Sequence, residues 1–330
     1  MRPFKYSRSG DINSATQMLV VNPKAKFLAG GTNILDLMKE DVERPDELVD
    51  ISRLKLMQVG MITTGTNKGG VSIGALGKNT DAANHPFVKE NFPLLSQAIL
   101  AGASAQIRNM ATNGGNLNQR TRCSYFFETS MPCNKREPGT GCGALEGNNR
   151  LHAILGWSEK CIAVHPSDMC VALAALDAVV KVKDAKGKER SIPFTEYHRL
   201  PGDTPDKDNN LNPGELITAI EIPKNNFAAK SHYLKIRDRS SYAFALISVA
   251  AALDMDGSQV KLARIAIGGV SHKPWRALEA ERFLVGKNTS EENFLKAAEA
   301  EMKMAKPLEH NKYKVEMAKR AIVRALMELV

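Results

Sequence analysis

The sequence of 330 residues lacks any long hydrophobic run. A membrane-spanning helix needs about 20 mostly apolar residues, whereas the most apolar uncharged run covers only residues 242–253. Arg2, Lys5 and Arg8 stand near the start, but no hydrophobic stretch follows them, so we expect no cleavable signal peptide. We therefore expect no membrane span, and a chain that either stays in the cytoplasm or is exported on a partner.

Aromatic residues and the common catalytic motifs are also scarce. Aromatic residues make up 6% of the chain, which is few for a protein that stacks on bases, and no run of five basic residues accompanies the net charge of +9. The charge is interpreted as a scattered basic surface, and nucleic acid is not an expected partner. GxSxG, HExxH and GxGxxG are absent, so a bound cofactor is expected to carry the chemistry.

Cysteines are few but concentrated. All five lie between residues 123 and 170, and no CxxC pair occurs, which argues against zinc ribbons, thioredoxin sites and ferredoxin runs. Residues 118–160 are rich in Gly, Pro and Asn without periodicity, so this segment needs an internal scaffold. Four thiolates would suit a 4Fe–4S cluster, with disulfides or zinc as alternatives. Cys170 lies in an apolar helical stretch and is interpreted as a core residue.

The remaining sequence predicts two regions of mixed helices and strands. Residues 1–55 alternate strand and helix, and residues 56–225 contain predicted hairpins at 59–75 and 179–193, helices at 80–91, 93–102 and 167–178, and strands at 161–164 and 216–222. From residue 226 onward, three strands (233–238, 243–254, 260–270) precede three helices (277–285, 291–305, 312–329). This order predicts an α+β domain at the C-terminal end.

Two glycine-containing loops are candidate cofactor sites. Gly30 and Gly31 follow a predicted buried strand and precede a helix, so backbone N–H groups there could approach a phosphate. Residues 112–116 form a second loop, predicted to be a turn and not a regular element. Lys235 ends a predicted strand near the domain junction and could contact an anionic or reduced cofactor.

Several motifs together resemble one protein family. They are residues 27–34 (FLAGGTNI), 111–117 (ATNGGNL), 119–123 (QRTRC), 132–135 (PCNK), 165–168 (HPSD), 215–223 (ELITAIEIP) and 235–240 (KIRDRS). The chain resembles the FAD-binding medium subunits of the molybdenum hydroxylases over essentially its whole length. Within that family it is most similar to the medium subunit of bacterial periplasmic aldehyde oxidoreductase.

The resemblance implies a fold, partners and a reaction. It implies an α+β chain: a two-part FAD-binding fold of the vanillyl-alcohol-oxidase-like type (residues 1–55 and 56–225), then a small C-terminal α+β domain (226–330). The expected partners are a large molybdenum-cofactor subunit, a small 2Fe–2S subunit and an external electron acceptor. The partner would oxidise an aldehyde to a carboxylic acid, and electrons would reach FAD in this chain. Such a heterotrimer can be periplasmic by co-export with a partner that carries the signal.

The resemblance also implies site residues. Residues 118–160 would be an insertion that carries a 4Fe–4S cluster, with Cys123, Cys133, Cys142 and Cys161 as its ligands. Lys235 would help to balance charge on the reduced flavin. The implied FAD contacts are Phe27, Leu28, Ala29, Gly30, Gly31, Thr32, Asn33, Ile34, Thr112, Gly114, Gly115, Asn116, Asp168, Ile217 and Lys235.

Other functions stay open at this point. The medium subunit of a xanthine dehydrogenase or of a hydroxybenzoyl-CoA reductase would share every one of these motifs. A stand-alone flavin oxidoreductase would need its own substrate site. An iron–sulfur or zinc nucleic-acid-binding module would explain the positive charge.

Overall fold

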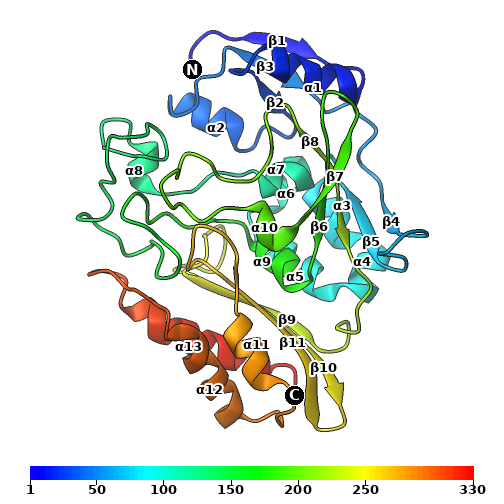
Figure 1. The fold of residues 1–330 in the computed structure, drawn as a ribbon, viewed down its shortest axis with the longest axis vertical. Helices are drawn as coiled ribbons and strands as arrows, with labels where there is room; N and C mark the ends of the chain where they lie inside the picture. Colours follow the sequence, from blue (N-terminus) through cyan, green and yellow to red (C-terminus); the bar gives the residue numbers. More distant parts are fainter.

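Three layers of secondary structure are stacked along the long axis of the molecule, with the N-terminus in the first layer and the C-terminus in the last (Figure 1). The computed structural model describes all residues from Met1 to Val330. The first layer is a parallel sheet of order β1-β3-β2 with two helices. Its elements are β1 (Lys5–Arg8), α1 (Ile12–Val21), β2 (Lys26–Leu28), α2 (Ile34–Lys39) and β3 (Glu47–Asp50).

The second layer is an antiparallel sheet of order β4-β5-β8-β6-β7, covered by short helices. A core cluster of 34 buried residues joins this sheet to the helices. The strands are β4 (Val59–Met61), β5 (Val71–Gly74), β6 (Val179–Lys183), β7 (Glu189–Pro193) and β8 (Leu216–Ile222). The helices are α3 (Asn79–Asn84), α4 (Pro86–Asn91), α5 (Pro93–Ala101), α6 (Ala105–Met110), α7 (Asn113–Leu117), α9 (Asp168–Ala175) and α10 (Phe194–Tyr197).

The third layer is an antiparallel sheet of order β12-β11-β10-β9 with three helices packed on it. A separate core cluster of 24 buried residues fills the space between them. The strands are β9 (Ser231–Ile236), β10 (Ile247–Asp256), β11 (Gln259–Gly268) and β12 (Trp275–Arg276), and the helices are α11 (Leu278–Leu284), α12 (Glu291–Met302) and α13 (Tyr313–Met327). No helix has the length and apolar character that crossing a membrane requires.

Three local predictions were wrong. Residues 112–116 form helix α7 and not a turn, because the Thr112 side chain accepts a hydrogen bond from the Gly115 N–H and caps the helix. The predicted helix at 80–91 divides into α3 and α4 at His85, whose extended backbone is typical of a residue before proline. Residues 161–164 lie outside any strand, apart from an isolated bridge between Ser158 and Cys161.

The cysteine-rich segment between α7 and α9 contains only one short helix, α8 (Ser124–Phe127). The segment stands out at one side of the molecule, between α2 and α13 (Figure 1). The Arg136 guanidinium donates hydrogen bonds to the carbonyl groups of Tyr125, Phe126 and Met131. The Asn134 amide accepts from the N–H groups of residues 139 and 141 and donates to the Lys160 carbonyl. Polar side chains therefore supply the internal scaffold that an irregular segment of this length needs.

Candidate functional site

A cleft of about 960 Å³ lies where the three layers and the cysteine-rich segment meet. Its volume is at the upper end of the range for ligand pockets, which suits a long cofactor. Of the predicted FAD contacts, six line it: Thr32, Asn33, Gly115, Asn116, Asp168 and Lys235. The other predicted contacts do not line it: Phe27, Leu28, Ala29, Gly30, Gly31, Ile34, Thr112, Gly114 and Ile217.

Gly30 acts through the backbone, by letting the turn between β2 and α2 approach α6. A Cβ atom on Gly30 would lie 2.2 Å from the Met110 carbonyl oxygen, so no other residue fits there. Gly31 has a φ of +74°, which glycine adopts without strain. This close turn brings Thr32 and Asn33, the next two residues, to the cleft.

Asn33 offers a free donor at the cleft. Its Oδ1 accepts a hydrogen bond of 3.0 Å from the Arg120 N–H, which fixes the amide group. Its Nδ2 is buried and has no hydrogen-bond partner in the protein. A buried donor without a partner costs free energy, and a ligand with phosphate or carbonyl oxygens would satisfy it. The arrangement fits a dinucleotide cofactor.

The second glycine-containing loop is joined to the 165–168 motif through Asn116. The Ser167 hydroxyl donates a 2.5 Å hydrogen bond to Asn116 Oδ1, although 51 residues separate the two in sequence. Asn116 Nδ2 donates to Asn79, whose own amide donates to Asn113. The cysteine-rich segment therefore leaves and returns at one place, and α7 and the start of α9 form one wall of the cleft.

Asp168 and Lys235 form a buried ion pair. Lys235 Nζ lies 2.8 Å from Asp168 Oδ2, and the two side chains are only 5% and 7% exposed. The Tyr233 hydroxyl donates to the other carboxylate oxygen at 2.8 Å, and the pKa of Tyr233 is raised well above 10, first by burial and then by the Asp168 charge. Asp168 thus already compensates the charge of Lys235, and the role of Lys235 in balancing charge on the reduced flavin stays a prediction.

Ile217, another of the predicted FAD contacts, does not line the cleft. It lies in β8, is 4% exposed and packs in the core of the second layer. Leu216, Ile220 and Ile222 of the same strand are buried as well. Its role in the structure is to pack the sheet.

Four of the five cysteines surround one small void of about 10 Å³ in the cysteine-rich segment: Cys123, Cys133, Cys142 and Cys161. No carboxylate lines it, whereas Lys135 and Lys160 do. Burial raises the pKa of Cys123 to about 12 and that of Cys161 to about 11. A metal group that bound here would have to displace the thiol protons.

The spacing of the sulfurs bears on which metal group fits. Four thiolates on one zinc ion, at about 2.3 Å from the metal, would stand ~3.8 Å apart. No three of the four sulfurs lie within 4.8 Å of one another. The void has the volume of one water molecule, and the thiols are spaced too widely to hold a single zinc ion without moving. No disulfide joins any of the five cysteines.

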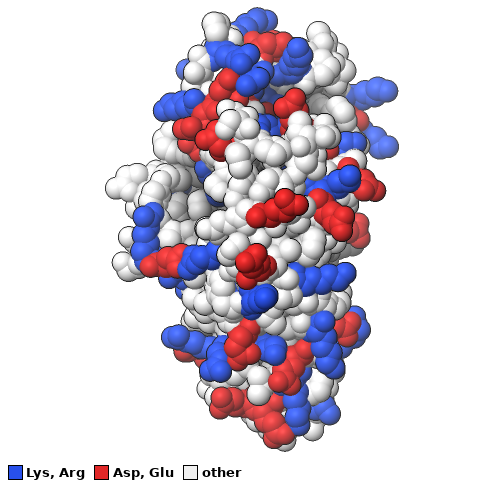
Figure 2. Space-filling model, turned by 90° about the vertical axis from the view of Figure 1, so that its left-hand side faces the viewer, with Lys and Arg blue, Asp and Glu red and all other residues white.

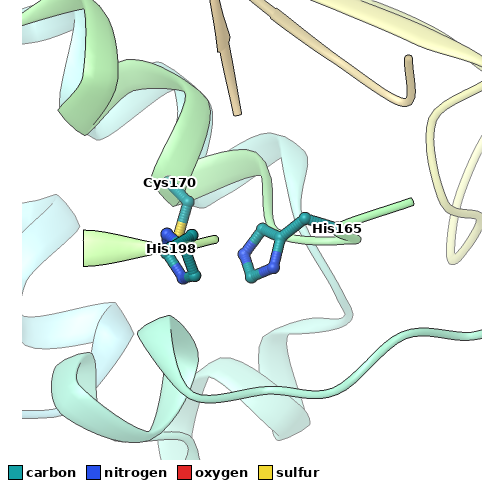
Figure 3. Close-up of side chains that lie close together, drawn as sticks. All are labelled: His165, Cys170 and His198. Atoms are coloured by element: carbon teal, nitrogen blue, oxygen red, sulfur yellow. The ribbon is translucent and has the colours of Figure 1, made fainter. Parts of the chain in front are cut away.

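Cys170 lies apart from the other four, in a cluster with His165 and His198 (Figure 3); Cys170 and His198 are buried, and His165 is partly buried. The three ligand atoms lie within 4.8 Å of one another, and the two imidazole rings are 4.3 Å apart. Burial raises the pKa of the Cys170 thiol to about 12 and lowers that of His198 to about 4. The cluster is therefore an uncharged group packed behind Ser167 and Asp168, and Cys170 is part of the core as predicted.

Sequence reasoning missed several residues of the cleft. The exposed aromatic rings of Tyr242 and Phe244 line it from the loop before β10, and the Arg122 guanidinium stacks on Phe244 at 5.5 Å. Arg150 of the cysteine-rich segment forms a two-point ion pair with Asp238 of the same loop. Arg122 belongs to the QRTRC motif, but the sequence does not indicate that its side chain contacts Phe244.

The charges on the surface are mixed. On the face shown in Figure 2, basic and acidic side chains are intermixed, and much of the middle of the face is uncharged. A nucleic-acid-binding surface would show a continuous basic stripe. On this face the basic side chains thus form no continuous stripe.

Two family models match the chain. Residues 2–225 match the FAD binding domain in molybdopterin dehydrogenase, and residues 232–329 match the CO dehydrogenase flavoprotein C-terminal domain. Both the FAD-binding fold and the C-terminal domain of the predicted α+β architecture are therefore confirmed.

Curated relatives and solved structures agree with these matches. The aldehyde oxidoreductase FAD-binding subunit PaoB of Escherichia coli is 47% identical over 99% of this chain and 98% of that protein. The glyceraldehyde dehydrogenase medium chain of Sulfolobus acidocaldarius is 30% identical over 88% of this chain and 83% of that protein. Among solved structures, a carbon monoxide dehydrogenase from Hydrogenophaga pseudoflava is 25% identical, with a TM-score of 0.76 over 99% of this chain and 97% of that chain.

Proposed function

Because the chain belongs to the family of FAD-binding subunits of the molybdenum hydroxylases, we propose that it is the electron-transfer subunit of a molybdenum-dependent aldehyde oxidoreductase. The observation that carries the proposal is the 47% identity to an aldehyde oxidoreductase subunit along nearly the full length of both chains. A large partner with the molybdenum cofactor would convert an aldehyde and water to a carboxylic acid. A small partner with 2Fe–2S centres would pass the two electrons to this subunit, which would deliver them to an external acceptor.

FAD supplies the redox chemistry of this subunit, since a flavin can accept two electrons and release them one at a time. The residues of this chain would bind and orient it. Asn33 would donate its free Nδ2 hydrogens to the cofactor, and the turn at Thr32 and Asn33 would face its phosphates. Asn116 and Gly115 would lie along another part of it, next to the Asp168–Lys235 pair.

The cysteine-rich segment would hold a 4Fe–4S cluster on Cys123, Cys133, Cys142 and Cys161. Two observations support this assignment: the four thiols share one void, and their spread exceeds the spacing that one zinc ion requires. Lys135 and Lys160 would offset part of the negative charge of four thiolates. Cys170 would take no part, since it lies in the core beside His198.

The heterotrimer would reach the periplasm by export with a partner that carries the signal. The resemblance stated above is the support for this compartment. Fractionation of cells that express all three subunits would test it, because partner-dependent export requires this chain to appear in the periplasm only when the partner keeps its signal. Cytoplasmic chain under both conditions would contradict it.

The visible spectrum of the purified protein, with iron and acid-labile sulfide measured on the same sample, tests the cofactors. We expect flavin bands together with about 4 Fe and about 4 sulfide from this chain beyond those of its partner's 2Fe–2S centres. Flavin without that iron would overturn the cluster and leave the flavin role in place. Neither flavin nor iron would overturn the proposed function.

A further inference from the structure

The cleft and the cysteine void share part of a wall, and one hydrogen bond crosses it. Thr121 and Cys123 line both spaces. Cys123 Sγ lies 3.1 Å from Nε2 of His152, and His152 itself lines the cleft. Among the four cysteines of the void, Cys123 thus connects the metal-binding region to the cofactor cleft.

His152 has the chemistry of a hydrogen-bond donor to this sulfur. A metal-bound thiolate can only accept a hydrogen bond, so Nε2 carries the hydrogen. The other ring nitrogen, Nδ1, is buried without a partner, which leaves the Cys123 contact as the only hydrogen bond of the ring. His152 is 5% exposed, so its ring has little contact with water.

The C-terminal domain fixes the backbone on which His152 stands. Lys314 of α13 donates to the carbonyl oxygens of Leu151 and His152 at 3.2 and 3.0 Å, and the neighbouring Asn311 amide donates to His152 and Ala153 at 3.3 and 3.2 Å. Both donors are fully buried. The ring of His152 is therefore held against Cys123 by a different domain from the one that carries the cysteines.

We propose that His152 is a positioning residue for the metal centre: it donates a hydrogen bond to Cys123, retains the cluster and makes it easier to reduce. The inference rests on the proposed function, since it assumes a 4Fe–4S cluster on the four cysteines. A donor to a cysteine sulfur stabilises the more negative reduced state, which raises the reduction potential. Removing a residue that hydrogen-bonds to a metal ligand typically weakens metal binding by about 10- to 100-fold.

The test compares four forms of the complete enzyme as purified with its partner subunits. His152→Leu keeps much of the volume and removes the donor, whereas His152→Gln keeps an N–H group. His310→Leu is the matched control, because His310 is exposed and its ring contacts neither space. The readouts are the midpoint potential of the cluster, followed by low-temperature EPR during a redox titration, and the rate at which a chelator removes iron from the cluster.

We expect His152→Leu to shift the midpoint potential of the cluster to a more negative value and to release its iron about tenfold faster. His152→Gln should restore both properties at least in part, and His310→Leu should match the wild type. A His152→Leu enzyme with wild-type potential and wild-type iron release would overturn the inference. Wild-type enzyme without cluster iron would overturn the proposed cluster itself, and the inference with it.

A second measurement needs no variant and covers the case in which His152→Leu fails to fold. Wild-type enzyme labelled with ¹⁵N-histidine should show a histidine nitrogen coupled to the reduced cluster in pulsed EPR. Identical spectra from histidine-labelled and unlabelled enzyme would overturn the contact between His152 and the cluster.

Discussion

Asp168 is the residue at which the second and third layers meet beside the cleft. Both of its carboxylate oxygens are used, one by Lys235 and one by the Tyr233 hydroxyl, and both partners belong to β9. Removing one member of a buried ion pair leaves the other charge without compensation. The pair therefore holds the C-terminal domain against α9 as well as shaping the cleft.

We expect Asp168→Asn to lower the free energy of unfolding by about 3 kcal/mol, because Lys235 keeps its charge in a buried site. Flavin content should fall as well, since the wall of the cleft loses its anchor. Denaturant unfolding and flavin fluorescence would measure the two effects. The control is Glu292→Gln, which breaks the exposed pair with Lys296 and should change stability by less than about 0.5 kcal/mol. Equal stability of both variants would contradict this account of the Asp168–Lys235 pair.

Four cysteines line the void and Cys170 lies in the core, so substitutions at the two places should have different effects on iron content. Cys133→Ala should remove the proposed cluster and its iron, since Cys133 lines the shared void. Cys170→Ala should keep all of the iron and cost about 1 kcal/mol of stability, because it deletes one buried atom from the core. Iron analysis and thermal unfolding of both variants check this. Iron loss in Cys170→Ala, or iron retention in Cys133→Ala, would show that the ligand set is wrong.

The short turn between β2 and α2 places a strict geometric demand on one residue. Gly30→Ala should weaken FAD binding at least tenfold, because a Cβ atom 2.2 Å from the Met110 carbonyl forces the turn away from α6. Overpacking of this kind costs about 1–3 kcal/mol. Gly10→Ala is the matched control, since a Cβ there meets nothing within 4 Å. Flavin titration of the apoproteins compares them, and equal affinities would refute the role of Gly30.

Elements with a clear hydrophobic period were the ones that the sequence predicted well. Strands β6, β7 and β8 have the predicted boundaries, because alternating residues such as Val180 and Val182 face the core while their neighbours face outward. Two helix N-caps are local in the same way: the Asp11 side chain of α1 and the Ser167 side chain of α9 each accept a backbone hydrogen bond from the residue three positions on. These features depend only on neighbours in sequence.

Helix α7 shows why other elements were not predictable. Two of its five residues are glycine, so no hydrophobic period marks it, and its single cap at Thr112 was read as part of a turn. The hydrogen bond between Ser167 and Asn116 spans 51 residues, and only the family resemblance suggested that these residues meet. The contact between His152 and Cys123 had no signal in the sequence, because a histidine 29 residues from a cysteine forms no motif.

At the scale of the whole molecule, the cleft exists because three layers contribute to it. The first layer provides Asn33, the second provides Asn116 and Asp168, and the third provides Lys235. The larger core cluster also contains Tyr233, Ala250, Ala252 and Ala266 of the third layer, so apolar packing joins the second and third layers. The buried Asp168–Lys235 pair adds a polar contact between these two layers beside the cleft.

Buried histidines between the layers make the stability of the molecule depend on pH. Burial lowers the pKa of His198 to about 4 and that of His272 to about 3, with the Lys135 charge as a further cause for His272. In the unfolded chain each would titrate near ~6.5. Between about pH 4 and pH 6.5 the unfolded state therefore binds more protons than the folded state, so stability rises with pH in this window and is lost as the pH falls through it.

Four histidines have a pKa lowered by burial: His152, His165, His198 and His272. We expect the free energy of unfolding to drop by up to about 5.6 kcal/mol per pH unit below pH 6.5, since each of the four contributes up to about 1.4 kcal/mol per unit. His272→Gln should reduce this slope by about a quarter, because one of the four groups no longer takes up a proton on unfolding. His310→Gln, on the exposed surface, should leave the slope unchanged. Denaturant unfolding at several pH values between 4 and 7 measures all three proteins. A wild-type stability that stays constant over this range would mean that His198 and His272 become protonated without unfolding, and that water reaches them in the folded protein.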